Sequence, residues 1–535
     1  MSALIVSASA VSFEYRDRTI LDNIDLRVHD GDRTALVGAN GSGKSTLLRL
    51  LAGLETPSGG EISAVAGARI AYLPQVSGQD AGLTVGRELA GRIGVADAEA
   101  EMDRLTGRLA DGDLSVLEAH AAAVEQWSNL GGGDFEARIG PALESVGVDR
   151  SWAERECRSL SGGQMARVRL AALRLARLDC ALLDEPSNHL DADGLEMLDR
   201  IVAEAEFAIV FASHDRGLLE RRAHDVVELD RTHARQYRGG WATYLREREA
   251  ERNAAETSYA EATAERDRLV TLERRIRQQG EIGQRRAKRS GETDKHVRYA
   301  AIQSAQKNTA ASGIAKRIEN VEIPEKPWKE NLSRLLLDSA QPVHATAVAV
   351  VREVILERDE WHSRPIDLAI GSGERILLRG ANGAGKSSLI AALTGRLEPV
   401  AGRIEIPASL RFTELAQRGG VLEGRERPLI EEFRELSGLG ETAARTALAA
   451  MRLGPERVSR APGLLSPGER TRAELALLAK RPAACLFLDE PSNHLDIEAM
   501  EVLESALEGW TGSLVLASHD PAMREKVRID RVVDL

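Results

Sequence analysis

Short apolar runs and longer amphipathic stretches alternate along this chain, and together they predict a mixed α/β protein. Thr34–Val37 is a short β-favouring run that leads directly into a glycine-rich turn, and the LLRLLAG stretch that follows has helical character. Ala181–Leu183 and Leu486–Leu488 are continuous apolar runs of the length of buried strands. Residues 86–150 are rich in Ala, Glu, Leu and Arg and predict a helical subdomain. No apolar run approaches the roughly 20 residues of a membrane-spanning helix.

A different pattern occupies residues 241–335. Charges of both signs surround sparse apolar positions, and the first proline of this stretch is Pro324, so the pattern predicts long exposed helices. Gly291 is the expected break between a first helical run and a second run that ends near Glu319. We therefore expect a charged helical hairpin as an interdomain linker, between globular domains at 1–240 and 336–535.

The two globular domains are copies of each other. GANGSGKS at 38–45 recurs as GANGAGKS at 380–387, and LLDEPSNHLD at 182–191 recurs as FLDEPSNHLD at 487–496. The first pair of motifs is offset by 342 residues and the second by 305, so the first copy carries 37 extra residues between them. We expect these extra residues to form a helical arm within 86–150.

Each glycine-rich motif stands between a predicted strand and a predicted helix, which is the context of a phosphate-binding P-loop. Its glycines let backbone N–H groups close around phosphates at a helix N-terminus. Lys44 and Lys386 are expected to reach the β- and γ-phosphates, and Ser45 and Ser387 to hold Mg²⁺. The nucleotide-binding candidates in the two motifs are Gly38, Asn40, Gly41, Gly43, Lys44, Ser45, Thr46, Gly380, Asn382, Gly383, Gly385, Lys386, Ser387 and Ser388.

The apolar run before each DEPSNHLD motif ends in an Asp-Glu pair. Asp184 and Asp489 are placed to bind Mg²⁺, and Glu185 and Glu490 to orient or polarise an attacking water. These residues therefore predict Mg²⁺ and an activated water beside the bound phosphates.

The ordered set of P-loop, glutamine, LSGGQ, LLDEP, SNHLD and SHD resembles the ATP-binding cassette superfamily. The resemblance implies two P-loop ATPase domains, each with a helical subdomain, that pair head to tail with each ATP between one P-loop and the other domain's signature. It places Ser466 and Gly468 with the first P-loop, and Ser161, Gly162 and Gly163 with the second. It also implies a Mg²⁺ contact for Gln75 and Gln417, a catalytic switch role for His214 and His519, and an interdomain loop at Asp191 and Asp496.

Two positions depart from this pattern. Tyr15 matches the aromatic residue that stacks on adenine, but the offset of 342 places Glu357 at the equivalent position of the second copy. Trp361 is the candidate substitute there. The second signature reads LSPGE, and Pro467 removes an N–H group that could face phosphate.

The net charge of −12, from 71 basic and 83 acidic residues, argues against general nucleic-acid binding. The linker is the exception, because its residues 274–289 include seven basic residues and a single acidic one, Glu281. This segregation indicates either a solvated helical face or a strip that contacts nucleic-acid phosphates such as those of RNA, formed by Arg274, Arg275, Arg277, Arg285, Arg286, Lys288 and Arg289.

Among cassette proteins, the fusion of both copies, the charged linker and the insertion in the first copy resemble the ABC-F family. The RAKRSGETDKHVR stretch and the end of the sequence soon after His519 resemble its actinobacterial antibiotic-resistance members. The resemblance implies a cytoplasmic monomer that binds the ribosome E-site through rRNA and tRNA. There it would act on tRNA and the peptidyl-transferase centre, as a resistance or translation factor. The alternative is the ATP-hydrolysing subunit of an exporter with separate membrane partners. Three cysteines are too few for a disulfide framework, which fits a reduced compartment.

Overall fold

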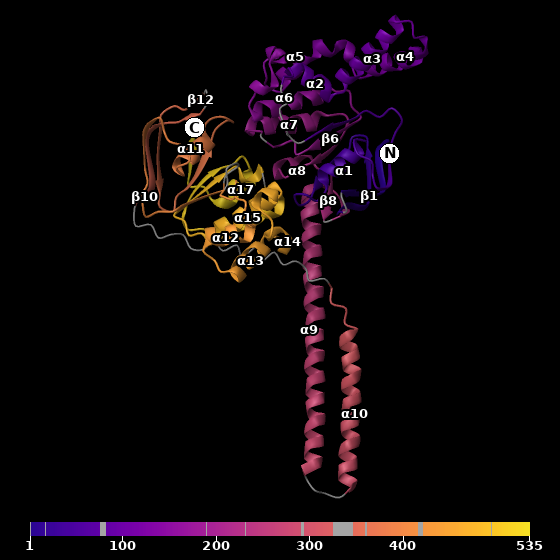
Figure 1. Ribbon diagram of the computed structural model, residues 1–535, viewed down its shortest axis with the longest axis vertical. Helices are drawn as coiled ribbons and strands as arrows, with labels where there is room; N and C mark the ends of the chain where they lie inside the picture. Colours follow the sequence, from indigo (N-terminus) through magenta and orange to yellow (C-terminus); the bar gives the residue numbers. More distant parts are fainter. Residues whose placement is uncertain are drawn as a thin grey trace. The chain divides into compact units, whose positions relative to one another are not determined.

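The structure is a computed structural model, which describes residues 2–15, 18–74, 82–188, 190–230, 232–289, 294–324, 346–358, 361–415, 421–493 and 495–535. The chain divides into two compact units (Figure 1). Unit one joins Met1–Ala242 to Asn331–Leu535 and therefore contains both copies, whereas unit two is Thr243–Glu330.

The first copy is built on a six-stranded sheet in the order β5-β6-β7-β3-β8-β9, in which only β9 is antiparallel to its neighbour. A second, antiparallel sheet has the order β2-β1-β4. The strands are β1 (Leu4–Tyr15), β2 (Arg18–His29), β3 (Arg33–Val37), β4 (Gly59–Ala64), β5 (Ile70–Leu73), β6 (Cys180–Asp184), β7 (Ala208–Ala212), β8 (Asp225–Asp230) and β9 (His233–Arg238).

Eight α-helices of the first copy lie in its described residues: α1 (Lys44–Leu51), α2 (Val85–Arg92), α3 (Val95–Ala110), α4 (Leu117–Asn129), α5 (Phe135–Ser145), α6 (Gly162–Leu175), α7 (Ala192–Glu204) and α8 (Arg216–Arg222). Leu47 and Leu48 of α1 belong to one buried cluster with Val6 of the antiparallel sheet and Leu182 and Val210 of the parallel sheet. The apolar faces of both sheets therefore pack on α1, which fixes the helix that follows the P-loop.

The second copy repeats this plan with a fully parallel sheet, β16-β17-β18-β14-β19, and an antiparallel sheet, β13-β10-β15. Its strands are β10 (Ala347–Ile355), β11 (Glu357–Arg358), β12 (Trp361–His362), β13 (Ile366–Gly371), β14 (Arg375–Arg379), β15 (Ala401–Glu405), β16 (Phe412–Leu415), β17 (Cys485–Asp489), β18 (Ser513–Ala517) and β19 (Arg531–Asp534). Its α-helices are α11 (Lys386–Leu393), α12 (Leu429–Ser437), α13 (Glu441–Ala450), α14 (Pro455–Val458), α15 (Pro467–Lys480), α16 (Ile497–Glu508) and α17 (Pro521–Val527).

The expected α/β class with two P-loop domains is confirmed by these sheets. Cys180 and Cys485 are buried on equivalent central strands, as small core residues. The insertion is the helical hairpin of α3 and α4, since only residues 438–440 separate α12 from α13 at the equivalent place in the second copy. A small cluster of Leu105, Val116 and Ala123 holds this hairpin together.

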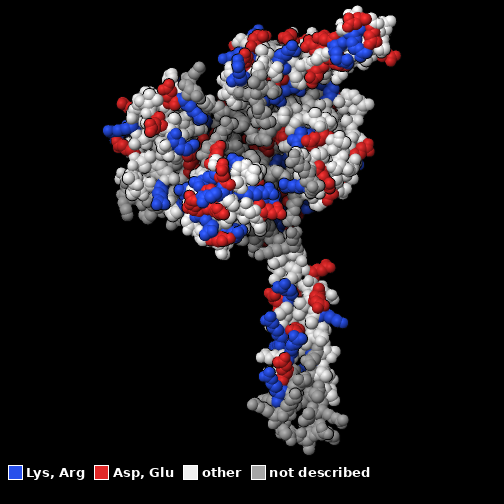
Figure 2. All heavy atoms as spheres, viewed as in Figure 1, with Lys and Arg blue, Asp and Glu red and all other residues white. Residues whose placement is uncertain are grey.

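Unit two contains two long helices, α9 (Gly240–Arg289, whose first residues belong to unit one) and α10 (Asp294–Glu319). Leu269 of α9 and Ala311 of α10 are buried, whereas most other described side chains of these helices are exposed. Acidic and basic side chains both lie along the described part of unit two in Figure 2. The expected break at Gly291 lies outside the described residues, and the domain boundaries at 240 and 335 stay predictions.

Candidate nucleotide-binding sites

The chemistry-bearing residues of each copy lie at the carboxyl ends of three adjacent parallel strands. In the first copy β3 leads into the P-loop, β6 ends at Asp184, and β7 is followed by His214. Because β6, β7 and β3 are neighbours in the sheet, these segments converge at one edge. β14, β17 and β18 repeat the arrangement in the second copy.

Each P-loop ends on a glycine that no other residue could replace without a shift of its neighbours. Gly43 precedes α1 with φ of 101°, and a Cβ there would lie 2.8 Å from Cδ2 of Leu21. Gly385 precedes α11 with φ of 102°, and its Cβ would lie 2.6 Å from the ring of Trp361. The first turns of α1 and α11 thus begin at the P-loops, where their free N–H groups favour an anion.

The two P-loop lysines have the same contacts. Lys44 Nζ donates to the carbonyl of Gly38 at 2.8 Å, and Lys386 Nζ donates to the carbonyl of Gly380 at 2.7 Å. Burial lowers the pKa of Lys44, although the carboxylates of Glu185, Asp496 and Asp184 act in the opposite direction. A buried ammonium next to helix N–H groups is a strong electrostatic partner for phosphate.

The Asp-Glu pairs combine buried carboxylates with an uncommon backbone conformation. Glu185 has φ of 50° and Glu490 φ of 45°, in the left-handed region that non-glycine residues rarely adopt. Burial raises the pKa of both glutamates to about 7. In each pair, the neighbouring Asp184 or Asp489 carboxylate also raises the pKa, while the lysine of the same P-loop lowers it.

His214 and His519 each contact the glutamate of their own copy. His214 Nε2 lies 3.1 Å from Glu185 Oε1 and 3.2 Å from Asn40 Oδ1. Burial lowers the pKa of His214 well below its ordinary value and that of His519 to about 4, so both imidazoles are neutral near pH 7. Since both neighbours of His214 Nε2 are oxygens, we assign the proton to this nitrogen.

Several buried polar atoms around each P-loop have no hydrogen-bond partner within the described part of the chain: Ser42 Oγ, Asp184 Oδ1, Glu185 Oε2, His214 Nδ1, Asp489 Oδ1, Glu490 Oε1 and His519 Nε2. Such atoms are costly unless a bound group satisfies them. Carboxylate oxygens beside a P-loop hydroxyl are the hard ligands that Mg²⁺ prefers. The donor set therefore fits Mg²⁺ together with a nucleoside triphosphate.

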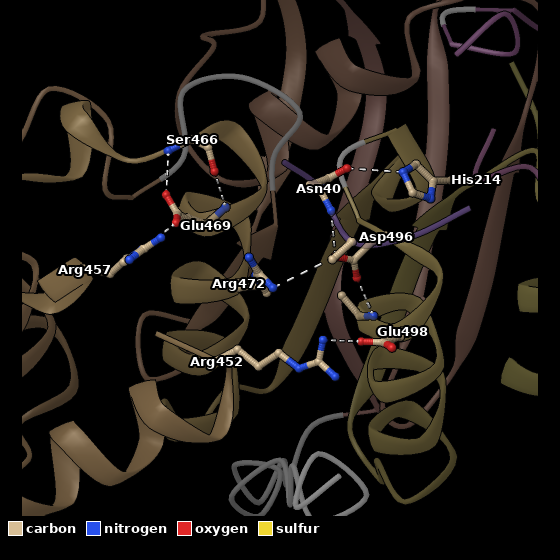
Figure 3. Close-up of polar contacts among 12 residues, drawn as sticks. Asn40, His214, Arg452, Arg457, Ser466, Glu469, Arg472, Asp496 and Glu498 are labelled. Atoms are coloured by element: carbon tan, nitrogen blue, oxygen red, sulfur yellow. Dashed lines mark hydrogen bonds and ion pairs between the residues drawn. The ribbon is translucent and has the colours of Figure 1, made fainter. Parts of the chain in front are cut away.

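The first cavity is lined by residues of both copies. Its walls are Ile20, Asn40, Gly41, Gly43, Lys44, Ser45, Thr46, Asp184, Glu185, Asn188 and His214 of the first copy and Ser466 and Gly468 of the second. Ser466 caps α15 in a capping box with Glu469 (Figure 3). Asn40 N donates to Asp496 Oδ2 of the second copy at 3.3 Å, and Arg472 Nη1 lies 4.0 Å from the same oxygen (Figure 3).

The second cavity has the reciprocal composition. Ser161, Gly162, Gly163 and Leu190 of the first copy and Arg358, Trp361, Ala381, Asn382, Gly383, Gly385, Lys386, Ser387, Ser388, Glu490 and His519 of the second form its walls. Arg167 Nη2 donates to both carboxylate oxygens of Asp191, at 2.6 and 2.7 Å. Volumes of about 330 and 530 Å³ put both cavities in the range of roughly 300–1,000 Å³ typical of ligand pockets.

The predicted adenine-stacking residues are arranged differently in the two copies. Tyr15 is 61% exposed and is not among the described residues that line the first cavity. Ile20 lines that cavity instead. In the second copy Glu357 is exposed on the β11–β12 hairpin, whereas Trp361 from the same hairpin lines the cavity. The stacking role of Tyr15 stays a prediction, and Trp361 is the aromatic residue that the fold places at the second site.

Sequence reasoning missed Tyr72, whose hydroxyl donates to Asp184 Oδ2 at 2.9 Å. Glu414 is its equivalent at the offset of 342, and this carboxylate pairs with Arg396. Burial raises the pKa of Glu414, and the nearby Asp489 contributes in the same direction. A comparison of the strands that precede the two glutamines would have revealed this difference.

Several predicted residues carry no structural account here. Gln75 and Gln417 lie outside the described residues. In the linker, Arg274, Arg275, Arg277 and Arg285 are exposed on α9, and Arg277 Nη1 lies 3.4 Å from Glu273. Arg286, Lys288 and Arg289 lie on α9, but their side chains are outside the described part. The proposed RNA contact of these residues stays a prediction.

Comparison with known proteins adds the family. A family model described as ABC transporter matches residues 21–188 and 363–493. The tylosin resistance ATP-binding protein TlrC of Streptomyces fradiae is 33% identical, over 97% of this chain and 95% of TlrC. ABC transporter F family member 2 of Arabidopsis thaliana is 26% identical, over 98% of this chain and 75% of that protein. This chain belongs to the ABC-F family.

Further similarities agree with this membership, which makes the chain an ATP-binding cassette ATPase. The energy-dependent translational throttle protein EttA of Mycobacterium tuberculosis is 29% identical, over 97% of this ABC-F chain and 89% of EttA. The archaeal ribosome recycling factor aABCE1 has a similar fold, with a TM-score of 0.56, 18% identity, and coverage of 98% of this chain and 87% of that one. No helix in the described residues has the length and apolar character needed to cross a membrane.

Proposed function

We propose that this ABC-F chain binds two ATP molecules between its cassettes, closes on them, and uses the closed form to act on the ribosome. The observation that carries the proposal is the reciprocal lining of the two cavities. Each cavity combines the P-loop, Asp-Glu pair and histidine of one cassette with the signature serine and glycine of the other. A nucleotide in either cavity would touch both cassettes, so its binding favours the closed arrangement.

Within each site the residues have separate tasks. Lys44 and Lys386 bind the β- and γ-phosphates with the P-loop N–H groups, and Ser466 and Ser161 add the N-termini of α15 and α6 from the opposite cassette. Ser45 with Asp184, and Ser387 with Asp489, would hold Mg²⁺. When bound, Mg²⁺ neutralises charge on the phosphate oxygens.

The glutamates and histidines belong to the hydrolytic step. Glu185 and Glu490 orient the attacking water and accept its proton, while the neutral His214 and His519 donate an N–H toward the phosphate or the glutamate. The contact of 3.1 Å between His214 Nε2 and Glu185 Oε1 fixes the two side chains relative to each other. Hydrolysis then removes the γ-phosphate that joined the cassettes, and the closed form opens.

Action on the ribosome is supported by the relatives and by the linker. TlrC is named for tylosin resistance and EttA for translational throttling, and both match nearly all of this chain. The exposed arginines of α9 offer positive charge in a net acidic chain. We therefore assign the linker to rRNA and tRNA at the E-site, close to the peptidyl-transferase centre. Ribosome protection against an antibiotic is the favoured outcome, since the TlrC match has the higher identity.

Ribosome pelleting tests this proposal. A chain carrying Glu185→Gln and Glu490→Gln should sediment with 70S ribosomes when ATP is present and stay in the supernatant with ADP. The wild-type chain expressed in a drug-sensitive host should raise the inhibitory concentration of tylosin. A double variant that never pellets with ribosomes would contradict the ribosomal role and favour an exporter subunit.

A further inference from the structure

A buried ion pair crosses between the two cassettes outside both nucleotide cavities. Arg216 Nη1, in the first cassette, donates to Glu504 Oε1 in the second at 2.7 Å. The Glu504 side chain is 0% exposed and that of Arg216 only 13%. The other oxygen of Glu504, Oε2, accepts from Lys526 of its own cassette at 2.8 Å. Arg216 therefore supplies half of the positive charge around a carboxylate that has no access to solvent.

The position of Arg216 ties this pair to the first nucleotide site. Arg216 opens α8, two residues after His214, and Asp215 between them caps the helix. Its second nitrogen, Nη2, donates to the carbonyl of Ile497, the first residue of α16, at 3.3 Å. The preceding residue, Asp496, accepts from Asn40 of the first P-loop. The first cassette thus contacts the start and the middle of one helix, α16, through its P-loop and through the histidine loop, the segment of residues 213–216 that carries His214 and Arg216.

The second cassette lacks the reciprocal contact. The residue that follows His519 and Asp520 is Pro521, which opens α17 as Arg216 opens α8. Proline is well suited to the first turn of a helix but has no side-chain donor. The carboxylate equivalent to Glu504 is Asp199, which pairs with Arg221 and Arg222 of its own cassette at 3.0 and 2.6 Å. Of these two equivalent positions, the one beside the first site has a cross-cassette ion pair and the one beside the second site does not.

We infer that Arg216 is a positioning residue that couples closure of the cassettes to the first ATP site, so that the two sites contribute unequally to the closed form. The reason is that its contacts with Glu504 and Ile497 exist only while α16 lies against the histidine loop. Removing one partner of a buried ion pair strongly destabilises the structure, because the remaining charge stays desolvated without a partner. This inference rests on the proposed nucleotide sites but not on the ribosome.

The test uses the purified full-length chain without ribosomes. Arg216→Ala should raise the ATP concentration for half-maximal hydrolysis by about tenfold or more, because closure becomes harder. Arg216→Lys should recover part of the loss, since an ammonium can still reach Glu504. The matched control is Arg221→Ala on the same helix, which breaks only a contact within the first cassette and leaves Asp199 paired with Arg222. It should behave as wild type.

A double-mutant cycle separates coupling from loss of folding. Arg216→Ala, Glu504→Gln and the double variant are compared by KM for ATP, kcat and melting temperature. We expect the double variant to be little worse than either single one. The inference is overturned if Arg216→Ala keeps the wild-type KM, or if Arg221→Ala shows the same loss. Glu185→Gln with Glu490→Gln is measured in parallel, because residual turnover there would contradict the site assignment instead.

Discussion

At the scale of single residues, the two cassettes share their motifs but differ in what surrounds them. Tyr72 donates to Asp184, whereas Glu414 places a carboxylate close to Asp489. The ring of Trp361 lies against the second P-loop, where the first has the aliphatic Ile20 and Leu21. These side chains set the charge and the apolar surface next to the nucleotide, so the two sites are chemically unequal.

Trp361→Ala should weaken nucleotide binding at the second site, since the ring lines that cavity and packs on Gly385. Aromatic contacts contribute on the order of 0.5–1.5 kcal/mol, so a loss of several-fold is expected. Titration with a fluorescent ATP analogue in the Glu185→Gln, Glu490→Gln background measures it. Glu357→Ala, on the same hairpin, is the control and should leave affinity unchanged. Equal losses in both variants would show that the hairpin acts only through stability.

At the scale of elements, two additions distinguish this chain from a simple pair of cassettes. The α3–α4 hairpin has its own small cluster of Leu105, Val116 and Ala123. Helices α9 and α10 form most of a separate compact unit. Because each addition has its own packing, each can vary with little effect on the sheets that carry the nucleotide sites.

The chain should therefore tolerate removal of the arm. Replacing residues 94–134 with Gly-Leu-Gly, the connection between α12 and α13 in the second cassette, should keep ATPase activity within about twofold, because surface insertions contribute little to a packed core. Melting temperature and ATP turnover measure the result. A collapse of both would mean that the arm is part of the first cassette's core.

Neutralising the exposed linker arginines should affect RNA binding but not hydrolysis. With Arg274, Arg275, Arg277 and Arg285 replaced by Gln, basal ATPase activity should persist, since these residues belong to unit two and the nucleotide sites to unit one. Ribosome affinity should fall, and its log–log salt slope should decrease by roughly 0.7–0.9 for each lost phosphate contact. Pelleting across a salt series is the measurement. An unchanged slope would make the linker a spacer.

At the scale of the whole molecule, each site depends on residues from opposite ends of the chain. Asn40 contacts Asp496 and lies beside Gly468, although more than 400 residues separate them in sequence. A change in one cassette's signature therefore acts on the other cassette's P-loop.

A methyl group on the signature glycine of the second cassette should disturb the first P-loop. A Cβ on Gly468 would lie 2.7 Å from Asn40 Nδ2 across the cassettes, whereas a Cβ on the nearby Gly463 has no atom within 4 Å in the described structure. Gly468→Ala should thus lower ATP turnover several-fold, and Gly463→Ala should leave it near wild type. Steady-state ATPase assays compare the two variants. The same activity in both would indicate that the cassettes do not pair as described.

Features that depend on neighbours along the chain could be predicted from the sequence alone. A β-favouring run, a GxxxxGKS motif and a helix in that order are typical of a P-loop, so Lys44, Lys386 and the two Asp-Glu pairs could be proposed as site residues from local sequence. The repeat gave the two copies, and the charge pattern of residues 241–335 gave the long helices. The alignment offset placed Glu357 rather than Trp361 at the position of Tyr15, and it did not show that Tyr72 contacts Asp184, because it carries no information on which side chain of a hairpin or strand points inward.

The residues that meet across the cassettes could be identified only from the folded structure. The contact of Arg216 with Glu504 joins positions 288 residues apart, and no local pattern marks either as a partner of the other. Its asymmetry became visible only once Pro521 was placed at the start of α17 and Asp199 was paired within its own cassette. Such contacts depend on how two folded surfaces fit together, whereas motifs depend on backbone geometry over a few residues.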